Sequence, residues 1–120
     1  MSCYRDWRDK FQDLIDKDGM YTIWQLDEAL AKGHSQLWAT KNAAVVTGIS
    51  DYEGGERMGQ VDWAVGDLND ILTKIMPRAE AYLKARKCTR IMFEGRLGWS
   101  RVLKAHGYRS HSVTLVKDIA

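Results

Sequence analysis

A strand, a short helix and a second strand-like run follow one another near the end of this chain, and this order constrains the fold most. Residues 91–93 are apolar and predict a strand, residues 99–105 have helical spacing, and Val113, Leu115 and Val116 form a second strand-like run. Gly107-Tyr108 separates the helix from that run, as glycine often does at a helix end. The segment therefore predicts a helical crossover connection within a mixed sheet.

Two helices are predicted at the start of the chain. The first lies within residues 1–18, and its apolar side chains recur at helical spacing between charged ones, at Tyr4, Trp7, Phe11, Leu14 and Ile15. The second spans residues 23–32, because Thr22 and Gln25 form a capping-box pair before it and Gly33 supplies a stop after it.

The middle of the chain changes from helical to strand-like patterning and back. Short β-branched and aromatic runs at residues 37–39, 43–49 and 61–65 predict three antiparallel strands joined by hairpins. Helical spacing then returns over residues 68–83. Pro77 lies inside this helix and lacks a backbone N–H, so a kink or break is predicted near Ile75 and Met76.

The composition is that of one globular domain. The chain has 120 residues, of which 45% are hydrophobic and 28% charged, and the sequence predicts one domain over residues 1–120. Residues 1–18 are predicted to be an amphipathic helix that is peripheral to the domain or binds a partner.

Charge and cysteine content exclude several classes of protein. With 18 basic and 16 acidic residues the net charge is +2, which gives no support to a nucleic-acid-binding surface. No apolar run approaches the roughly 18 residues of a membrane span. Cys3 and Cys88 match no metal or disulfide pattern, so free thiols and a cytoplasmic location are expected, and no metal site is predicted.

The order of elements, ending in Gly107-Tyr108, resembles that of the GNAT superfamily of acyl-coenzyme A N-acyltransferases from about Thr22 to Val116. The resemblance implies an α+β fold. It implies a single GNAT-like domain with a mixed sheet of about five strands, an antiparallel hairpin half and two crossover helices.

A more specific resemblance covers the second half of the chain. From Gly66 to Lys117 the sequence is similar to a set of small phage and prophage proteins with a GNAT-like fold. The shared residues are Gly66-Asp67-Leu68, Pro77, Cys88-Thr89-Arg90, Glu94-Gly95-Arg96, Gly98-Trp99, Arg101-Val102-Leu103, Gly107-Tyr108-Arg109 and Val113-Thr114-Leu115. The resemblance implies a protein that works in the host cytoplasm or is packaged in a phage particle.

In the GNAT superfamily a glycine-rich loop at the start of the long helix holds the pyrophosphate of coenzyme A through backbone N–H groups. The corresponding loop here contains one glycine, no arginine, and both Asp67 and Asp70. Asp67 is therefore predicted to cap the helix. If acetyl-coenzyme A binds, the candidate residues are Val65, Gly66, Leu68 and Asn69 with Arg96 and Arg101.

The superfamily often uses a tyrosine in the last helix as the acid that protonates the leaving thiolate, and Leu103 occupies that place here. Glu94 and Tyr108 are the remaining candidate catalytic residues. Each also has an ordinary structural explanation, Glu94 as an ion-pair partner of Arg96 or Arg101 and Tyr108 as a half-buried aromatic.

The sequence thus predicts a catalytically degenerate, phage-type GNAT-like protein that acts as an interaction or virion-associated structural component, with no cofactor. Its expected partner is a protein, either a second copy or another phage protein, and Trp7 and Phe11 on the first helix are the candidate contacts, since Trp is enriched at interface hot spots. The alternative is an active acetyl-coenzyme A-dependent N-acetyltransferase acting on an unknown amine.

Overall fold

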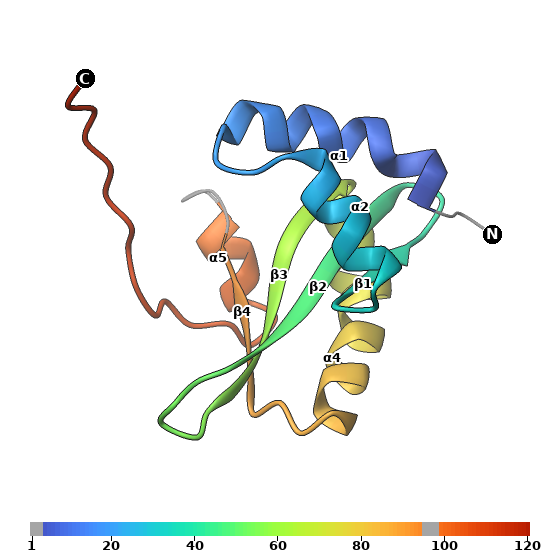
Figure 1. The fold of residues 1–120 in the computed structure, drawn as a ribbon. Helices are drawn as coiled ribbons and strands as arrows, with labels where there is room; N and C mark the ends of the chain where they lie inside the picture. The colour runs from blue at the N-terminus through green and yellow to red at the C-terminus, as the bar shows by residue number, and fades with distance from the viewer. Residues whose placement is uncertain (1–3, 95–98) are drawn as a thin grey trace.

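The computed structural model describes residues 4–94 and 99–120 (Figure 1). Arg96, one of the candidate cofactor residues, lies outside the described residues. In chain order the elements are α1 (Tyr4–Asp18), α2 (Ile23–Ala31), β1 (Ser35–Ala39), β2 (Ala43–Asp51), β3 (Arg57–Gly66), α3 (Leu68–Asp70), the π-helix η1 (Ile71–Ile75), α4 (Met76–Ala85), β4 (Arg90–Phe93) and α5 (Trp99–Lys104).

The strands form one mixed sheet in the order β1-β2-β3-β4. The first three strands pair antiparallel, as the hairpin pattern predicted, and β4 pairs parallel to β3 after a crossover through α3, η1 and α4. Helices α1 and α2 cover one face of the sheet, while η1, α4 and α5 cover the other (Figure 1). The predicted α+β class and the mixed sheet are therefore confirmed.

The strand predicted around Val113 and Leu115 is absent. Residues 109–120 have no regular structure and extend away from the domain (Figure 1). The sheet therefore has four strands instead of about five. The chain does not rejoin the sheet after α5. A β-branched run only favours a strand, and it becomes one by pairing with a neighbour. Residues 109–120 pair with no strand among the described residues.

Pro77 distorts the long helix where the sequence predicted. The turn before it is the π-helix η1, in which the Met76 N–H donates to the carbonyl of Ile71, five residues earlier. Proline has no N–H and its ring needs space from the carbonyl four residues before it, so a wider turn relieves both problems. Regular α-helix resumes in α4 with Pro77 in its first turn.

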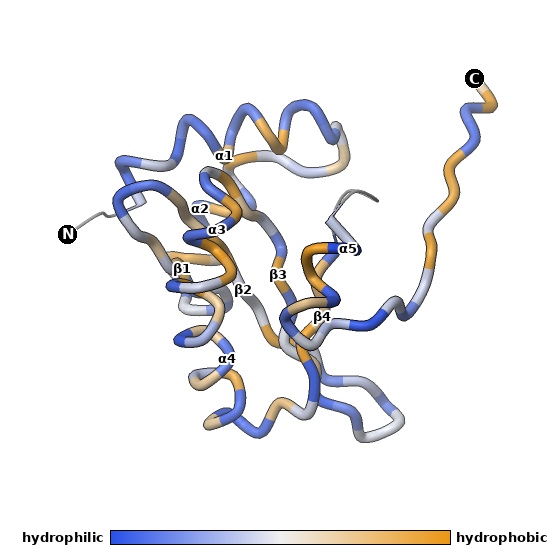
Figure 2. The backbone as a smooth tube through the Cα atoms, turned by 180° about the vertical axis from the view of Figure 1, so that it is seen from behind, coloured by the Kyte–Doolittle hydropathy of each residue, from blue (hydrophilic) through white to orange (hydrophobic). Residues whose placement is uncertain are grey.

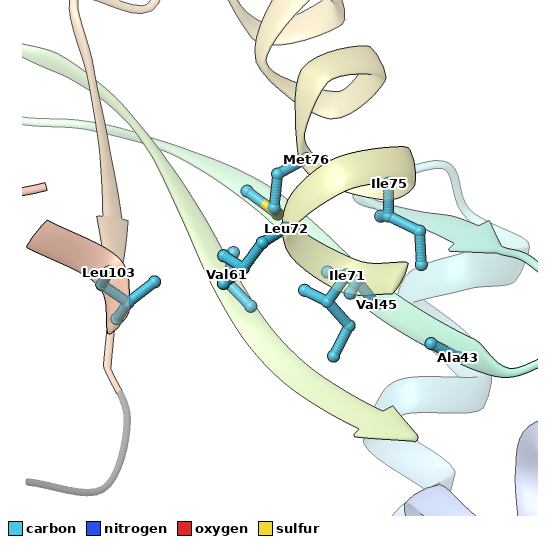
Figure 3. Close-up of a cluster of buried hydrophobic side chains, with 8 residues drawn as sticks. All are labelled: Ala43, Val45, Val61, Ile71, Leu72, Ile75, Met76 and Leu103. Atoms are coloured by element: carbon cyan, nitrogen blue, oxygen red, sulfur yellow. The ribbon is translucent and has the colours of Figure 1, made fainter. Parts of the chain in front are cut away.

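Two apolar clusters hold the helices to the two faces of the sheet. The first lies between the sheet, η1, α4 and α5, and Figure 3 shows its buried members, Ala43, Val45, Val61, Ile71, Leu72, Ile75, Met76 and Leu103. The second lies under α1 and α2 and consists of Trp7, Phe11, Ile15, Ile23, Leu26, Ala44 and Val46. Alternate residues of β2 enter opposite clusters, so both faces of this strand are buried.

Trp7 and Phe11, the candidate partner contacts, belong to this second cluster. Trp7 is 5% exposed and Phe11 is fully buried. Because α1 is bound to the sheet through these side chains, they act as packing residues and are not available to a partner in this structure.

Candidate functional site

Strands β3 and β4 separate before β3 ends. Their pairing runs from Met58 opposite Arg90 to Val61 opposite Phe93, whereas β3 continues to Gly66. Beyond Val61, this edge of β3 has no strand neighbour among the described residues, and Asp62 and Glu94 are the residues that follow the last pair. The divergence of two parallel strands opens the sheet at this point.

Asp62 is the extra residue of a β-bulge. Val46 of β2 pairs with Trp63 and Thr47 pairs with Val61, which leaves Asp62 without a partner on β2. A bulge changes the direction in which a strand presents its side chains and is frequent near functional sites. Here it places a carboxylate at the opening of the sheet, beside Gly48 and Gln60.

Gly48 makes room for the Asp62 carboxylate. A Cβ atom at Gly48 would lie 2.9 Å from Asp62 Oδ2 and 3.0 Å from Gln60 Nε2, both too close for any larger residue without a shift of these side chains. Gln60 is itself positioned, because its Oε1 accepts a hydrogen bond of 3.0 Å from Ser50 Oγ. Gly48, Ser50 and Gln60 thus determine the position of the Asp62 carboxylate.

The environment of Asp62 favours its protonated form. Desolvation by the surrounding protein, reinforced by the negative charge of Glu94 and opposed by the hydrogen bond to Gln60, raises the pKa of Asp62 to about 6. Asp62 is also exposed to solvent in the opening, so water screens part of this effect. A carboxylate with a raised pKa in a cleft is a common mark of a functional site.

A cleft of about 920 Å³ begins at this opening and runs between the sheet and the α1–α2 connection. Charged side chains in its walls are the carboxylates of Asp18, Asp62 and Glu94 and the ammonium group of Lys17. The aromatic and large apolar side chains in its walls include Met20, Tyr21, Tyr52, Trp63, Met92, Phe93 and Trp99. The rings of Tyr21 and Trp63 pack edge to face with centroids 5.9 Å apart, which shapes the wall nearest α2. The cleft is large enough for a small ligand or a peptide side chain.

An exposed apolar patch adjoins the cleft. Met20, Tyr21 and Trp24 are 72%, 53% and 73% exposed, and Met20 and Tyr21 also line the cleft. Trp24 follows directly after Ile23, and one residue along a helix turns a side chain by about 100° away from the buried face. The exposed tryptophan of this protein is therefore Trp24 on α2.

The two predicted catalytic candidates lie in different surroundings. Glu94 is exposed and lines the cleft near Asp62. Tyr108 lines a separate hollow, where its ring packs edge to face on Phe93 at 6.2 Å and its buried hydroxyl has no hydrogen-bond partner among the described residues. Burial, and then the charge of Glu80, raise the pKa of Tyr108 well above its ordinary value.

The turn from β3 to α3 is built from internal contacts. As predicted, Asp67 caps the helix, and its Oδ2 accepts a hydrogen bond of 3.0 Å from the Asp70 N–H. Asp70 is 5% exposed, accepts a hydrogen bond of 2.8 Å from Thr40 Oγ1 and lies 3.5 Å from Lys74 Nζ. The Thr40 hydrogen bond, with the nearby Lys74 charge, lowers the pKa of Asp70, which keeps this carboxyl negative.

The other residues proposed for cofactor binding are spread over several environments. Val65 packs against the cluster under α1 and α2, and Leu68 packs against the cluster under α4. Asn69 is exposed, and its carbonyl accepts a hydrogen bond from Thr73 Oγ1. Arg101 is exposed on α5.

These residues do not fit the pyrophosphate of coenzyme A. A phosphate needs free N–H groups and positive potential at a helix start, whereas this start carries two carboxylates and uses the Asp70 N–H for its own cap. Leu103 occupies the place where the GNAT superfamily often has a tyrosine acid, and its side chain is buried in the first cluster (Figure 3). Among the described residues, the start of α3 therefore carries negative charge where a phosphate would need positive potential.

Sequence reasoning missed Asp62 and Trp24. The signal for Asp62 was a single carboxylate between Val61 and Trp63 inside a predicted strand. The signal for Trp24 was its position outside the helical spacing of Ile23, Leu26 and Leu30.

The described part of the chain contains neither a cluster of metal ligands nor a helix that could span a membrane. Within residues 4–94 and 99–120, no three His, Cys, Asp or Glu side chains come together in a way that could hold a metal ion. No helix in the same ranges is both long enough and apolar enough to cross a bilayer.

Solved structures with this fold are acetyltransferases of the GNAT superfamily. Glucosamine-6-phosphate N-acetyltransferase from Arabidopsis thaliana aligns with a TM-score of 0.69 over 99% of this chain and 95% of its own, at 14% identity. A predicted acetyltransferase with acetyl-CoA from Clostridium acetobutylicum aligns with a TM-score of 0.66 over 94% and 86% of the two chains, at 17% identity.

A third structure, a putative acetyl transferase from Pyrococcus furiosus, aligns with a TM-score of 0.65 over 99% of this chain and 81% of its own, at 13% identity. No protein-family model and no curated protein sequence matches the chain. At these identities the similarity shows a GNAT-like fold, and it contains no indication of a phage origin.

Proposed function

We propose that this protein uses a GNAT-like fold to bind a protein partner through a primary ammonium group, such as a lysine side chain or an N-terminus, and that it does not transfer acetyl groups. The observation that carries the proposal is the pair of carboxylates, Asp62 and Glu94, in an aromatic-lined cleft. Carboxylates hold an ammonium group by charge-assisted hydrogen bonds, and aromatic faces add cation–π attraction.

The exposed patch of Met20, Tyr21 and Trp24 supports a protein as the source of the ammonium group. The patch adjoins the cleft, so a peptide whose amine enters the cleft contacts it at the same time. Trp and Tyr dominate the binding energy of many protein interfaces.

The first test concerns the ammonium group. We expect a short peptide with a free lysine to bind more weakly to Asp62→Asn than to the unchanged protein, by about tenfold, because one charge-assisted contact is lost. Isothermal titration measures this, and the same peptide acetylated on its lysine and N-terminus is the ligand control. Equal affinity for the free and the acetylated peptide would contradict the proposal.

The same site predicts a pH dependence. Because the pKa of Asp62 is about 6, the carboxyl is mostly ionised above pH 7 and mostly protonated below about pH 5. Affinity for the free amine is therefore expected to fall as the pH drops through this range, and the fall is expected to be smaller in Asp62→Asn.

The second test concerns the cofactor. We expect acetyl-coenzyme A at about 1 mM to leave the melting temperature unchanged, since a ligand stabilises the folded state only when its concentration approaches its dissociation constant. The carboxylates of Asp67 and Asp70 at the helix start are the physical reason. A dissociation constant in the micromolar range would overturn this half of the proposal.

A second candidate function is catalytic. The raised pKa of Asp62 suits a general base that accepts a proton from an amine. An active N-acetyltransferase would release free thiol from acetyl-coenzyme A when amines are supplied, and this release would stop in Asp62→Asn. No thiol release over a broad panel of amines leaves the binding function as the answer.

The phage setting belongs to this proposal as well. Its support is the run from Gly66 to Lys117 that resembles small phage proteins. Mass spectrometry of purified particles from a phage that encodes this chain tests whether the protein is a virion component.

A further inference from the structure

The charged residues of this chain are unevenly distributed along it. Residues 1–70 contain 7 basic and 13 acidic residues, whereas residues 71–120 contain 11 basic and 3 acidic residues. The net charge of +2 conceals this asymmetry, and for that reason the whole-chain charge gave no support to a nucleic-acid partner. A strong difference in charge between the halves of a chain indicates a polyanionic partner, either a nucleic acid or a membrane surface.

The fold converts this asymmetry into two faces of opposite charge. Helices α1 and α2 lie on one face of the sheet, and η1, α4 and α5 lie on the other. Residues 4–31, which include α1 and α2, contain 7 acidic and 4 basic residues. Residues 71–90, which include η1 and α4, contain 6 basic residues and 1 acidic residue. In Figure 2, α4 lies at the outside of the domain, so its outer face is open to solvent.

Five exposed cations form what we call the basic face of α4, namely Lys74, Arg78, Lys84, Arg86 and Lys87. From Lys74 to Arg86 the chain rises by about 18 Å, since each residue of a helix adds about 1.5 Å. One strand of B-DNA presents about five phosphates over this length. The basic face therefore has the extent of a short phosphate backbone.

These cations have little competition from acidic side chains. Among the described residues, only Lys74 of the basic face forms an ion pair, at 3.5 Å from Asp70. Arg78 Nε donates to the Lys74 carbonyl at 3.2 Å, and the Arg86 guanidinium lies 4.4 Å from the centre of the Tyr82 ring. These contacts hold both guanidinium groups at the surface, where such groups pair well with phosphate oxygens.

The surroundings of the basic face distinguish between the two kinds of polyanion. Glu80, the acidic residue within residues 71–90, interacts with His106 and Tyr108, which places it on the side of α4 toward α5. None of the exposed large apolar side chains lies within residues 71–90. A helix that binds a membrane surface inserts apolar side chains beside its cations. The basic face therefore suits a nucleic acid better than a lipid surface.

We propose that the basic face of α4 binds the phosphate backbone of a nucleic-acid duplex without reading its base sequence. Contacts to phosphates position a protein on a duplex and carry no direct sequence information. The amine cleft opens on the side of α1 and α2, on the other face of the sheet, so this surface adds to the proposed function and stands without it.

Fluorescence anisotropy with a labelled 20-bp DNA duplex of mixed sequence tests the proposal, and an RNA duplex of the same sequence shows which nucleic acid is preferred. We expect at least one duplex to bind with a dissociation constant in the micromolar range at about 50 mM NaCl. Four cations without an acidic partner give a slope of about −3.6 for log affinity against log salt, so affinity is expected to fall about 100-fold by about 200 mM NaCl.

Two double variants locate the surface. Arg78→Gln with Lys84→Gln removes two cations from the basic face and is expected to weaken binding at least about tenfold and to reduce the salt slope by about 2. Arg5→Gln with Lys10→Gln removes the same charge from exposed positions on α1 and is the matched control, expected to change affinity by less than about twofold. Thermal melting confirms that both variants are folded.

Three results would overturn the proposal. The first is no change in anisotropy with either duplex at about 100 μM protein and low salt. The second is an equal loss of affinity in the two double variants, which would mean that binding depends on net charge and not on the basic face. The third is binding to phosphatidylglycerol vesicles in a flotation assay with no binding to either duplex, which would assign the face to a membrane surface.

Discussion

Phe11→Ala is expected to lower the free energy of unfolding by about 4 kcal/mol. Phe11 is fully buried in the cluster that joins α1 to the sheet, and its ring lies 6.4 Å from that of Tyr4. Replacing a buried phenylalanine with alanine removes apolar contacts and leaves a cavity, which together cost about 3–5 kcal/mol. Urea denaturation followed by circular dichroism measures the loss.

Trp24→Ala is the matched control for this prediction. Trp24 is also aromatic and helical but is 73% exposed, so its removal is expected to change the stability by less than about 0.5 kcal/mol. If Phe11→Ala changed the stability as little as Trp24→Ala, the assignment of Phe11 to the core would be wrong. Such a result would favour the role in partner binding that the sequence suggested for Phe11.

Gly66→Ala is expected to cost about 3 kcal/mol or more. Gly66 has φ of +100°, a conformation that residues with a Cβ rarely adopt. An added Cβ would lie 2.3 Å from the carbonyl oxygen of Asn42 and 2.6 Å from Cα of Ala43, both backbone atoms that cannot move aside cheaply. Thermal melting of the variant, with its concentration held fixed, checks the prediction.

Gly54→Ala is the control for Gly66→Ala. Gly54 lies in the β2–β3 hairpin with open space around its Cα, so alanine there is expected to be neutral or slightly stabilising. A similar effect of the two substitutions would contradict the packing argument. The expected difference would show that the close approach of β3 to the start of β2 requires glycine at position 66.

The cleft and the start of the long helix have different chemistry. On the side of α1 and α2, Asp62 and Glu94 line a cleft that suits an amine. On the side of the long helix, Asp67 and Asp70 make the helix start negative and internally bonded. A fold shared with acetyltransferases does not by itself carry their reaction, because function depends on the residues of the site.

Local sequence patterns determined most of the secondary structure. The spacing of Trp7, Phe11 and Ile15 predicted α1 and its buried face, because helical periodicity is a property of neighbouring residues. Pro77 predicted the disturbed turn before it, since a missing N–H acts within one helical turn. Asp67 predicted its own helix cap for the same reason.

What the sequence did not determine depends on contacts between distant segments. The raised pKa of Asp62 arises from desolvation by the surrounding protein and from the charge of Glu94, which follows β4 and lies more than 30 positions away in the sequence. Whether Val113 and Leu115 form a strand depends on whether an edge is available to pair with them. Burial of Trp7 rather than Trp24 depended on which helix faces met the sheet. Periodicity in the sequence indicates which residues share a face of a helix or strand. Only the tertiary structure decides whether that face packs against another element or is exposed to solvent.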